Sequence, residues 1–325
     1  MNPSEAGTPL SRLAGVALGF NILVILWGAV VRATGSGAGC GAHWPTCNGS
    51  VVPLAPSVAT LIEYSHRATS GIALLLVALV VSQVFRRRRS GHLARFWAGA
   101  SMALILTEAA LGAGLVLFQK VADDASTARG FWISGHLINT FLLLAALTLT
   151  WRFVDDSDRD SRAAAGGLLA ASFPCARHAA AGLAVVALMA TGVSGAIAAL
   201  GDTLFKAQTL GEAIAQDFSS TSHIFVRLRI LHPLIALAGG GLLLMLAYRT
   251  ITTNPDRPKG RRLGLNLAGL VVAQWFLGLT NLVLLAPTPL QIGHLLVADL
   301  IWITLILVLA EGGVQPARSD GSTGS

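Results

Sequence analysis

The chain has 325 residues, of which 54% are hydrophobic and only 12% are charged, and its formal net charge is +7. Because soluble domains carry roughly 25% charged residues, this composition excludes an ordinary water-soluble enzyme and indicates a membrane protein. The basic residues are concentrated between and beside the apolar runs, so the positive charge reflects membrane topology rather than a nucleic-acid-binding surface.

Eight apolar runs approach the roughly 20 residues that a helix needs to span a bilayer. In chain order they cover approximately residues 13–31, 61–84, 96–117, 131–151, 179–200, 224–247, 263–285 and 292–310. Sixteen Lys and Arg residues fall on one predicted side and seven on the other, and cytoplasmic segments are usually the richer in these residues. We therefore predict an all-α membrane protein with eight transmembrane helices and both termini in the cytoplasm.

The first run is long and has no small-x-small cleavage site, so we expect no cleavable signal peptide. An Arg-rich, acid-poor transit sequence is not found before Arg12 either. Both features favour a bacterial plasma membrane over a mitochondrial one.

A glycine- and proline-rich outer loop follows the first run and contains Cys40, His43 and Cys47. The outer side of the membrane is oxidising, which favours a disulfide between the two cysteines and a rigid lid over the helices. A zinc site with His43 is the alternative, although it lacks a fourth ligand nearby. Cys175, near the cytoplasmic side, is expected to be a free thiol.

Four histidines lie at similar depth near the outer ends of apolar runs, and these are His66, His136, His232 and His294. Ionisable side chains are costly in a membrane, so four of them at one level require a shared reason. Imidazole is a good ligand for heme iron, and bundle cores commonly hold cofactors. We predict two histidine pairs, each able to hold one heme iron. The alternative is that these residues form hydrogen bonds between helices.

The second half of the chain repeats the pattern of the first. Glu108-x-x-x-Gly112 in the third run corresponds to Gln274-x-x-x-Gly278 in the seventh. The Gly-His-Leu motif at His136 likewise corresponds to the motif at His294. Four helices per repeat is an even number, so both halves enter the membrane from the same side. We therefore expect two pseudo-twofold-related four-helix bundles.

Glu63 precedes His66 by three residues and shares its helix face, whereas the position equivalent to Glu63 in the second half is Arg229. Glu63 could pair with Arg67, orient the imidazole, or act on a substrate. Because only the first half has this acid, we expect the two sites to do different work.

Glu108, Gln274, Asn139 and Asp299 are expected to pack inside the bundles. Four arginines at the outer mouths could meet heme propionates or simply anchor the interface: Arg67, Arg129, Arg227 and Arg229.

Three features together resemble the heme A synthase family. They are the loop motif from Thr34 to Cys47, the sequence Glu-Tyr-Ser-His-Arg at 63–67, and the Gly-His motifs at His136 and His294. The resemblance covers essentially all eight helices. It implies oxidation of the C8 methyl group of heme O by two hydroxylations, followed by loss of water, which gives heme A for cytochrome oxidases.

The resemblance also assigns the two halves. It implies a substrate heme O site at His66 and His136 within residues 1–155. It implies a heme b cofactor site at His232 and His294 within residues 156–325. The same resemblance implies that Glu63 is catalytic and that Cys40 and Cys47 form the loop disulfide.

Some members of that family have a second cysteine pair between the fifth and sixth helices. Residues 201–222 contain no cysteine here, so we expect other contacts to hold this segment. A heme O synthase and an electron donor are further partners that the resemblance suggests.

Two other functions are compatible with eight apolar helices. A transmembrane di-heme cytochrome would need hemes at two depths, whereas all four histidines lie toward the outside. A transporter built from repeats would need broken helices and polar groups near the midplane. Pro233 is the only candidate break beside a site.

Overall fold

The computed structural model describes residues 8–157, 175–253 and 258–313. The long helices are α1 (Pro9–Ala33), α2 (Val58–Arg87), α3 (Leu93–Leu117), α4 (Thr127–Phe153), α6 (Cys175–Leu204), α9 (Leu231–Thr253), α10 (Pro258–Val283) and α11 (Thr288–Gly313). Shorter elements are η2 (Ser36–Ala38), α7 (Leu210–Phe218) and α8 (Ile224–Arg229). The described part of the chain contains helices and loops but no named strand, so the predicted all-α class is confirmed.

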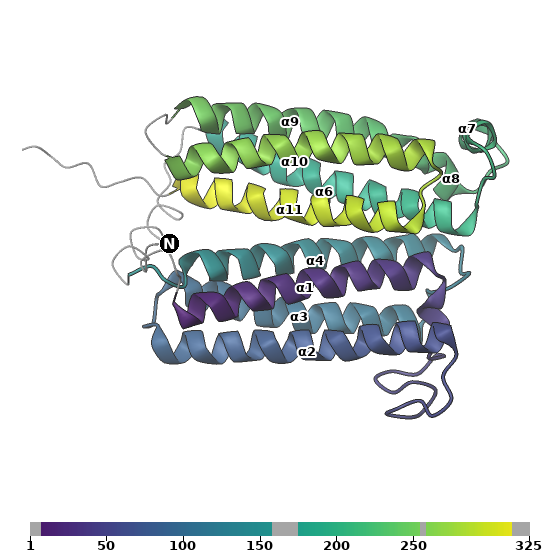
Figure 1. Ribbon diagram of the computed structural model, residues 1–325, viewed down its shortest axis with the longest axis horizontal. Coiled ribbons are helices and arrows are strands. Elements are labelled where there is room, and N and C mark those ends of the chain that lie inside the picture. Colours follow the sequence, from purple (N-terminus) through teal and green to yellow (C-terminus); the bar gives the residue numbers. More distant parts are fainter. Residues whose placement is uncertain (1–7, 158–174, 254–257, 314–325) are drawn as a thin grey trace, which may run out of the picture.

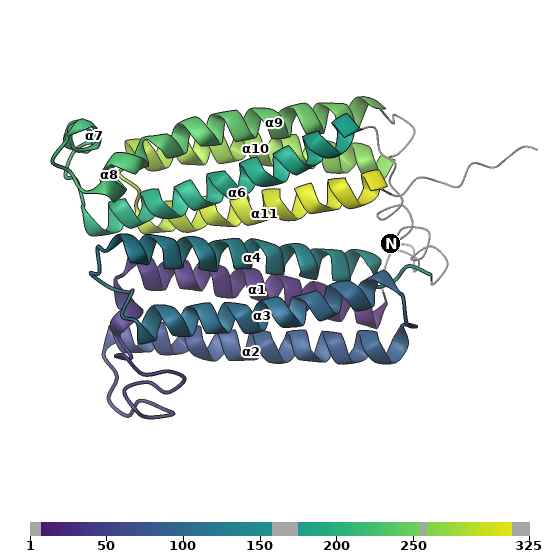
Figure 2. The same cartoon turned by 180° about the vertical axis from the view of Figure 1, so that it is seen from behind.

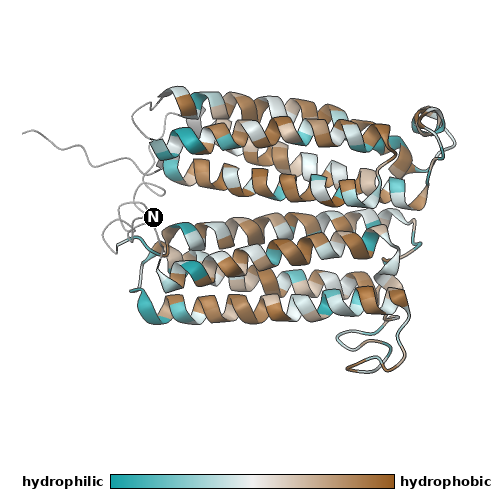
Figure 3. Ribbon diagram, in the orientation of Figure 1, coloured by the Kyte–Doolittle hydropathy of each residue, from teal (hydrophilic) through white to brown (hydrophobic). Residues whose placement is uncertain are grey.

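Eight spans in the described residues are long and apolar enough to cross a membrane, and each overlaps one of the predicted runs. Hydrophobic residues run along both bundles, whereas many of the hydrophilic ones lie near the helix ends and in the connections (Figure 3). Large apolar side chains also point outward, among them Leu75 at 70% exposed and Phe276 at 68%. Such exposure is expected where lipid rather than water covers the protein. The chain is therefore a multi-pass membrane protein.

The long helices form two bundles that lie side by side (Figure 1). One contains α1, α2, α3 and α4, and the other contains α6, α9, α10 and α11, as the view from behind also shows (Figure 2). The bundles meet where α1 and α4 contact α11 and where α4 contacts α6. This arrangement agrees with the expected pair of related bundles. The cytoplasmic location of the termini stays a prediction, because it depends on the charge distribution alone.

An aromatic pair closes the interface between the bundles. Phe141 of α4 and Trp302 of α11 are 2% and 1% exposed, and their ring centroids are 5.0 Å apart. The indole Nε1–H of Trp302 also donates a hydrogen bond of 2.7 Å to the carbonyl oxygen of Phe141. A buried indole normally requires such a partner, so this contact satisfies the polar group while the rings exclude solvent.

The outer connections are fixed by local sequence chemistry. Ser57 caps α2 by accepting a hydrogen bond from the Thr60 amide, and Ser126 caps α4 in the same way. Helix α8 ends at Arg229 and α9 begins at Leu231, so Pro233 lies in the first turn of α9, where a proline is tolerated. The break therefore lies beside His232, where Pro233 predicts it.

Arg229 holds the segment between α6 and α9. Its guanidinium pairs with Asp202 at 2.6 Å and with Asp217 at 2.7 Å, and it donates to the carbonyl oxygen of Ala213 at 3.1 Å. Asp202 belongs to α6, whereas Asp217 and Ala213 belong to α7. These contacts confirm that interactions other than a disulfide secure this cysteine-free loop.

Candidate functional site

The two histidines of the C-terminal bundle face each other across its interior. The ring centroids of His232 on α9 and His294 on α11 are 6.4 Å apart, and the ring planes are nearly perpendicular at 88°. Two imidazoles that share one metal through bonds of about 2 Å have ring centres on the order of 6 Å apart. This spacing is therefore compatible with one iron between the two rings.

Small residues make room for the first ring of this pair. A Cβ atom on Gly195 of α6 would lie 2.9 Å from Cε1 of His232, so only glycine leaves the ring its present position. The adjacent Ser194 places its hydroxyl 3.1 Å from Nδ1 of His232. A hydrogen bond to one ring nitrogen fixes the orientation of the ring and leaves the other nitrogen available as a ligand.

The N-terminal bundle repeats this packing. A Cβ atom on Gly28 of α1 would lie 3.2 Å from Cε1 of His66, as at the equivalent glycine of α6. His66 is within electrostatic range of His136 and of Glu108. Nδ1 of His136 lies 3.1 Å from Oε1 of Glu108, although the two groups are not aligned as a hydrogen bond. The structure thus brings His66, His136 and Glu108 together, and the contact of Glu108 was missed because its expected role was packing.

Three of the four histidines carry a buried ring nitrogen without a hydrogen-bond partner: Nδ1 of His66, of His136 and of His294. Unsatisfied polar atoms are costly in an apolar interior, so the rings of His66 and His294 have ligand capacity to spare. Nδ1 of His136 instead faces Oε1 of Glu108, which leaves Nε2 as the nitrogen of that ring available to a metal. Among the described residues, no group of three or more His, Cys, Asp or Glu side chains could hold a bare metal ion. A pair of imidazoles instead fits an iron that brings four porphyrin nitrogens and needs only two axial ligands.

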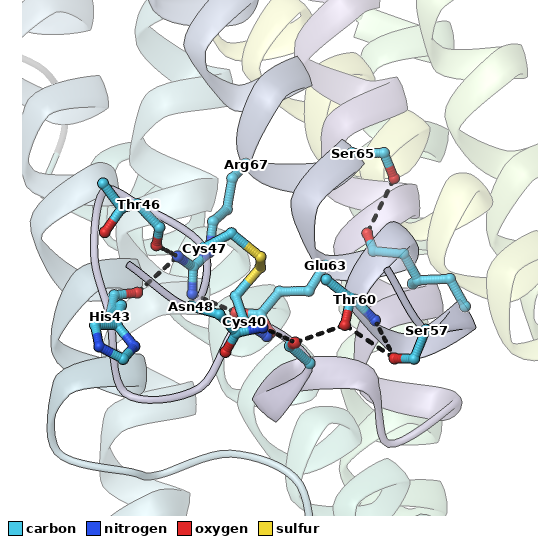
Figure 4. Close-up of a disulfide and its surroundings, with 12 residues drawn as sticks. Cys40, His43, Thr46, Cys47, Asn48, Ser57, Thr60, Glu63, Ser65 and Arg67 are labelled. Atoms are coloured by element: carbon cyan, nitrogen blue, oxygen red, sulfur yellow. Dashed lines mark hydrogen bonds and ion pairs between the residues drawn. A yellow bond between two sulfur atoms is a disulfide. The ribbon is translucent and has the colours of Figure 1, made fainter. Parts of the chain in front are cut away.

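Glu63 is buried beneath the outer loop, with only 3% of its surface exposed (Figure 4). Its Oε2 accepts a hydrogen bond of 2.8 Å from the amide of Cys40, and its Oε1 pairs with Arg67 at 2.5 Å. Arg67 in turn donates to the carbonyl oxygens of His43 and Thr46, each at 2.7 Å. Of the three roles open to Glu63, the ion pair with Arg67 is the one that this structure contains.

The disulfide predicted between Cys40 and Cys47 is confirmed. Both cysteines are almost fully buried, at 0% and 1% exposed. Because their sulfur atoms bond to each other, they cannot serve the alternative zinc site with His43. The loop packs tightly on α2, since a Cβ atom on Gly39 would lie 2.5 Å from the backbone of Ala59.

The arginines at the outer mouths differ in how they are used. Arg129 is 3% exposed and donates to the carbonyl oxygens of Ala122 and Asp124, which closes the connection between α3 and α4. Arg67 and Arg229 are engaged with the loops as described above, whereas Arg227 is exposed. Contact of any of these four with a heme propionate stays a prediction.

Arg32 of α1 joins the two bundles near their outer ends, a role that no pattern in the sequence predicts. Its guanidinium donates to the carbonyl oxygen of Ala199 at 2.9 Å and to the hydroxyl of Thr203 at 2.8 Å, both on α6. It also donates to Oε1 of Gln291 on α11 at 2.8 Å. An arginine at the end of an apolar run predicts an interfacial anchor, and its partners depend on how the bundles pack.

The remaining intramembrane polar residues are buried to different effect. Asn139 hydrogen-bonds across to α3, and the amide of Gln274 lies 3.2 Å from Nε2 of His294. Asp299 is 1% exposed, and its Oδ2 has no hydrogen-bond partner among the described residues. Asp299 is therefore packed inside the bundle, as expected, whereas Gln274 belongs to the histidine site.

Comparisons with known proteins give one family match and several named relatives. Residues 11–306 match the family model COX15-CtaA, which describes a cytochrome oxidase assembly protein. A protein of Thermus thermophilus named protoheme IX farnesyltransferase is 46% identical over 329 residues, covering 96% of this chain and 52% of that protein. The chain thus spans about half the length of that relative.

Proteins named heme A synthase match a shorter part of the chain. The one from Alkalihalophilus pseudofirmus is 37% identical over 126 residues, which cover 39% of this chain and 42% of that protein. The one from Shouchella clausii is 39% identical over 138 residues, which cover 42% of this chain and 45% of that protein.

Proposed function

Because this chain belongs to the COX15-CtaA family of cytochrome oxidase assembly proteins, we propose that it is a heme A synthase. It would oxidise the C8 methyl group of heme O to a formyl group by two successive hydroxylations, giving heme A for cytochrome c oxidase. The observation that carries this proposal is the pair of facing imidazoles, His232 and His294, whose ring centroids are 6.4 Å apart. The glycine contact of His232 recurs at His66, where Gly28 of α1 takes the place of Gly195 of α6.

The two bundles divide the work in this proposal. Residues 156–325 hold heme b through His232 and His294, and residues 1–155 hold heme O against His66 and His136. When bound, heme b supplies electron transfer. The contacts of the C-terminal pair support this division, because neutral Ser194 and Gln274 are the polar side chains bonded to those two rings. The N-terminal pair instead has carboxylates nearby, and these suit a site where protons are released.

Glu63 is the residue that we propose for proton transfer during oxidation of the methyl group. It lies about one helical turn before His66 on the same face of α2. Its carboxylate is held by the Cys40 amide and by Arg67, so its position is fixed before substrate arrives. A carboxylate that is held in place before the substrate arrives needs little rearrangement to accept a proton from the reacting group. The lid formed by the loop would limit access of bulk water to it.

The proposed location is the plasma membrane of a bacterium, with the substrate entering from the lipid. A farnesylated heme partitions into a bilayer, and eight apolar spans provide the matching environment. A relative that is named for farnesyl transfer to protoheme IX supports a heme O synthase as the source of substrate. An electron donor is the remaining partner that the oxidation requires.

The test is extraction of pigments from cells that make heme O, with and without the full chain. We expect heme A only when the wild-type protein is present. Glu63→Gln should retain bound heme b and lose heme A formation, since the amide keeps an acceptor for the Cys40 amide but cannot take up a proton. Lys206→Ala removes an exposed charge at the outer end of the other bundle and should form heme A normally. Heme A from the Glu63→Gln variant at the wild-type level would remove Glu63 from the mechanism.

A further inference from the structure

The second histidine of each half has a polar partner at the same position of the repeat. In the N-terminal bundle, Oε1 of Glu108 on α3 lies 3.1 Å from Nδ1 of His136 on α4. In the C-terminal bundle, Nε2 of Gln274 on α10 lies 3.2 Å from Nε2 of His294 on α11. One histidine therefore meets a carboxylate and the other meets a neutral amide of nearly the same shape.

The carboxylate of Glu108 is anchored by a network of its own. Asn139 donates to its Oε2 at 2.5 Å, and the hydroxyl of Thr140 donates to its Oε1. Thr107 in turn donates to Oδ1 of Asn139 at 2.7 Å. These bonds all join α3 to α4 beside His136, so both carboxylate oxygens are fixed.

The second repeat lacks every member of this network. Taking the two histidines and the Glu/Gln pair as equivalent positions, the residues that replace Thr107, Asn139 and Thr140 are Ala273, Val297 and Ala298. The anchors are therefore present only where the acid is present. Simple packing between two helices would not require a carboxylate, and an ionisable group in a membrane interior is costly unless it has a use.

A carboxylate beside a ligand imidazole has a defined physical effect. When it accepts a hydrogen bond from the nitrogen that does not bind the metal, it fixes the tautomer and the ring orientation and makes the ligand more basic. Oε1 of Glu108 lies within hydrogen-bonding distance of Nδ1 of His136 but is not aligned with it in this structure. Its negative charge also stabilises the more oxidised, more positive state of the iron, and this attraction is stronger in a low-dielectric interior than in water. A neutral amide can orient the ring but adds no charge.

We propose that Glu108 is a positioning residue that holds His136 as an axial ligand and lowers the midpoint potential of a heme bound in the N-terminal bundle below that of the heme at His294. This inference rests on the proposed function, because it requires heme at both histidine pairs. The difference between the two sites then resides in a carboxylate and an amide at equivalent positions.

The test uses the purified full-length chain loaded with iron protoporphyrin IX, followed by redox titration with visible and electron paramagnetic resonance spectroscopy. The His294→Ala background isolates the N-terminal heme, and the His136→Ala background isolates the C-terminal one. We expect the N-terminal heme to have the lower potential. Glu108→Gln should raise the midpoint potential of the N-terminal heme toward the potential of the C-terminal heme. Glu108→Asp keeps the negative charge and should retain much of the low potential.

The reciprocal variant supplies an independent arm. Gln274→Glu should lower the potential of the C-terminal heme and leave the N-terminal heme unchanged, and it carries the test if Glu108→Gln does not fold. Unchanged potentials in both variants, with heme bound, would reduce Glu108 to a contact between helices and overturn the inference. Failure of wild-type protein to bind heme in the N-terminal bundle would overturn it as well. None of these readouts depends on heme A formation. A protein that binds both hemes with the expected potentials but forms no heme A would therefore contradict the proposed function and leave this inference standing.

Discussion

Replacing Arg67 by alanine should loosen the outer loop from the end of α2. The guanidinium makes an ion pair with Glu63 at 2.5 Å and donates to the carbonyl oxygens of His43 and Thr46. The side chains of Arg67 and Glu63 are only 13% and 4% exposed, so this is a buried pair rather than a surface one. Removing the arginine leaves the carboxylate of Glu63 with the Cys40 amide as its remaining hydrogen-bond donor.

The size of the effect follows from burial. Breaking a buried ion pair by removing one partner costs about 3–5 kcal/mol. The loop carbonyls can rehydrate, so we take the lower end, about 3 kcal/mol, for the free energy of opening the loop. Since about 1.4 kcal/mol corresponds to a factor of ten, the open fraction should rise on the order of a hundredfold.

The disulfide supplies the assay. Cys40 and Cys47 are 0% and 1% exposed, so a membrane-impermeant phosphine can reduce them only when the loop opens. The rate of reduction, followed by labelling of the released thiols, should therefore rise on the order of a hundredfold in Arg67→Ala. Lys206→Ala, an exposed cation on the other bundle, is the matched control and should match wild type. A rate for Arg67→Ala equal to that of the control would refute the inference that this ion pair closes the loop.

Two further substitutions probe the histidine packing and the bundle interface. Gly195→Val should displace the ring of His232, because even its Cβ atom would lie 2.9 Å from Cε1, and the heme absorbance assigned to the C-terminal bundle should fall. Gly241→Val, where a Cβ atom meets nothing within 4 Å, is the control and should retain that absorbance. Trp302→Ala removes the ring that packs on Phe141 and should cost about 3–5 kcal/mol in the free energy of unfolding, measured by titration with a denaturing detergent. An unchanged unfolding midpoint would show that the pair does not hold the bundles together.

The sequence predicted those features that depend on local chemistry or on a period along the chain. The membrane spans could be predicted because the thickness of the bilayer sets the length of each apolar run. The structure has a helix at each of the eight predicted runs. The depth of the four histidines follows from counting residues along the helices in the same way. The disulfide could be predicted because Cys40 and Cys47 lie close together in a short outer loop.

Features that depend on packing between helices could not be predicted. The hydrogen bonds of Arg32 to α6 and α11 exist because the two bundles meet there, and no pattern near Arg32 identifies those partners. The Glu63 ion pair was one of three open roles, since spacing along α2 did not say whether the loop would cover the carboxylate. The contact between Glu108 and His136 joins neighbouring helices, and it required the rotation of each helix to be known.

The most direct test of the central claim is the spectrum of the full-length protein loaded with iron protoporphyrin IX. Paired imidazoles predict six-coordinate, low-spin iron in the wild-type protein. His294→Ala should remove that signature from the C-terminal bundle while the heme at His66 and His136 remains. An identical six-coordinate spectrum and heme content in the His232→Ala and His294→Ala variants would show that these residues do not hold the iron, and would contradict the claim.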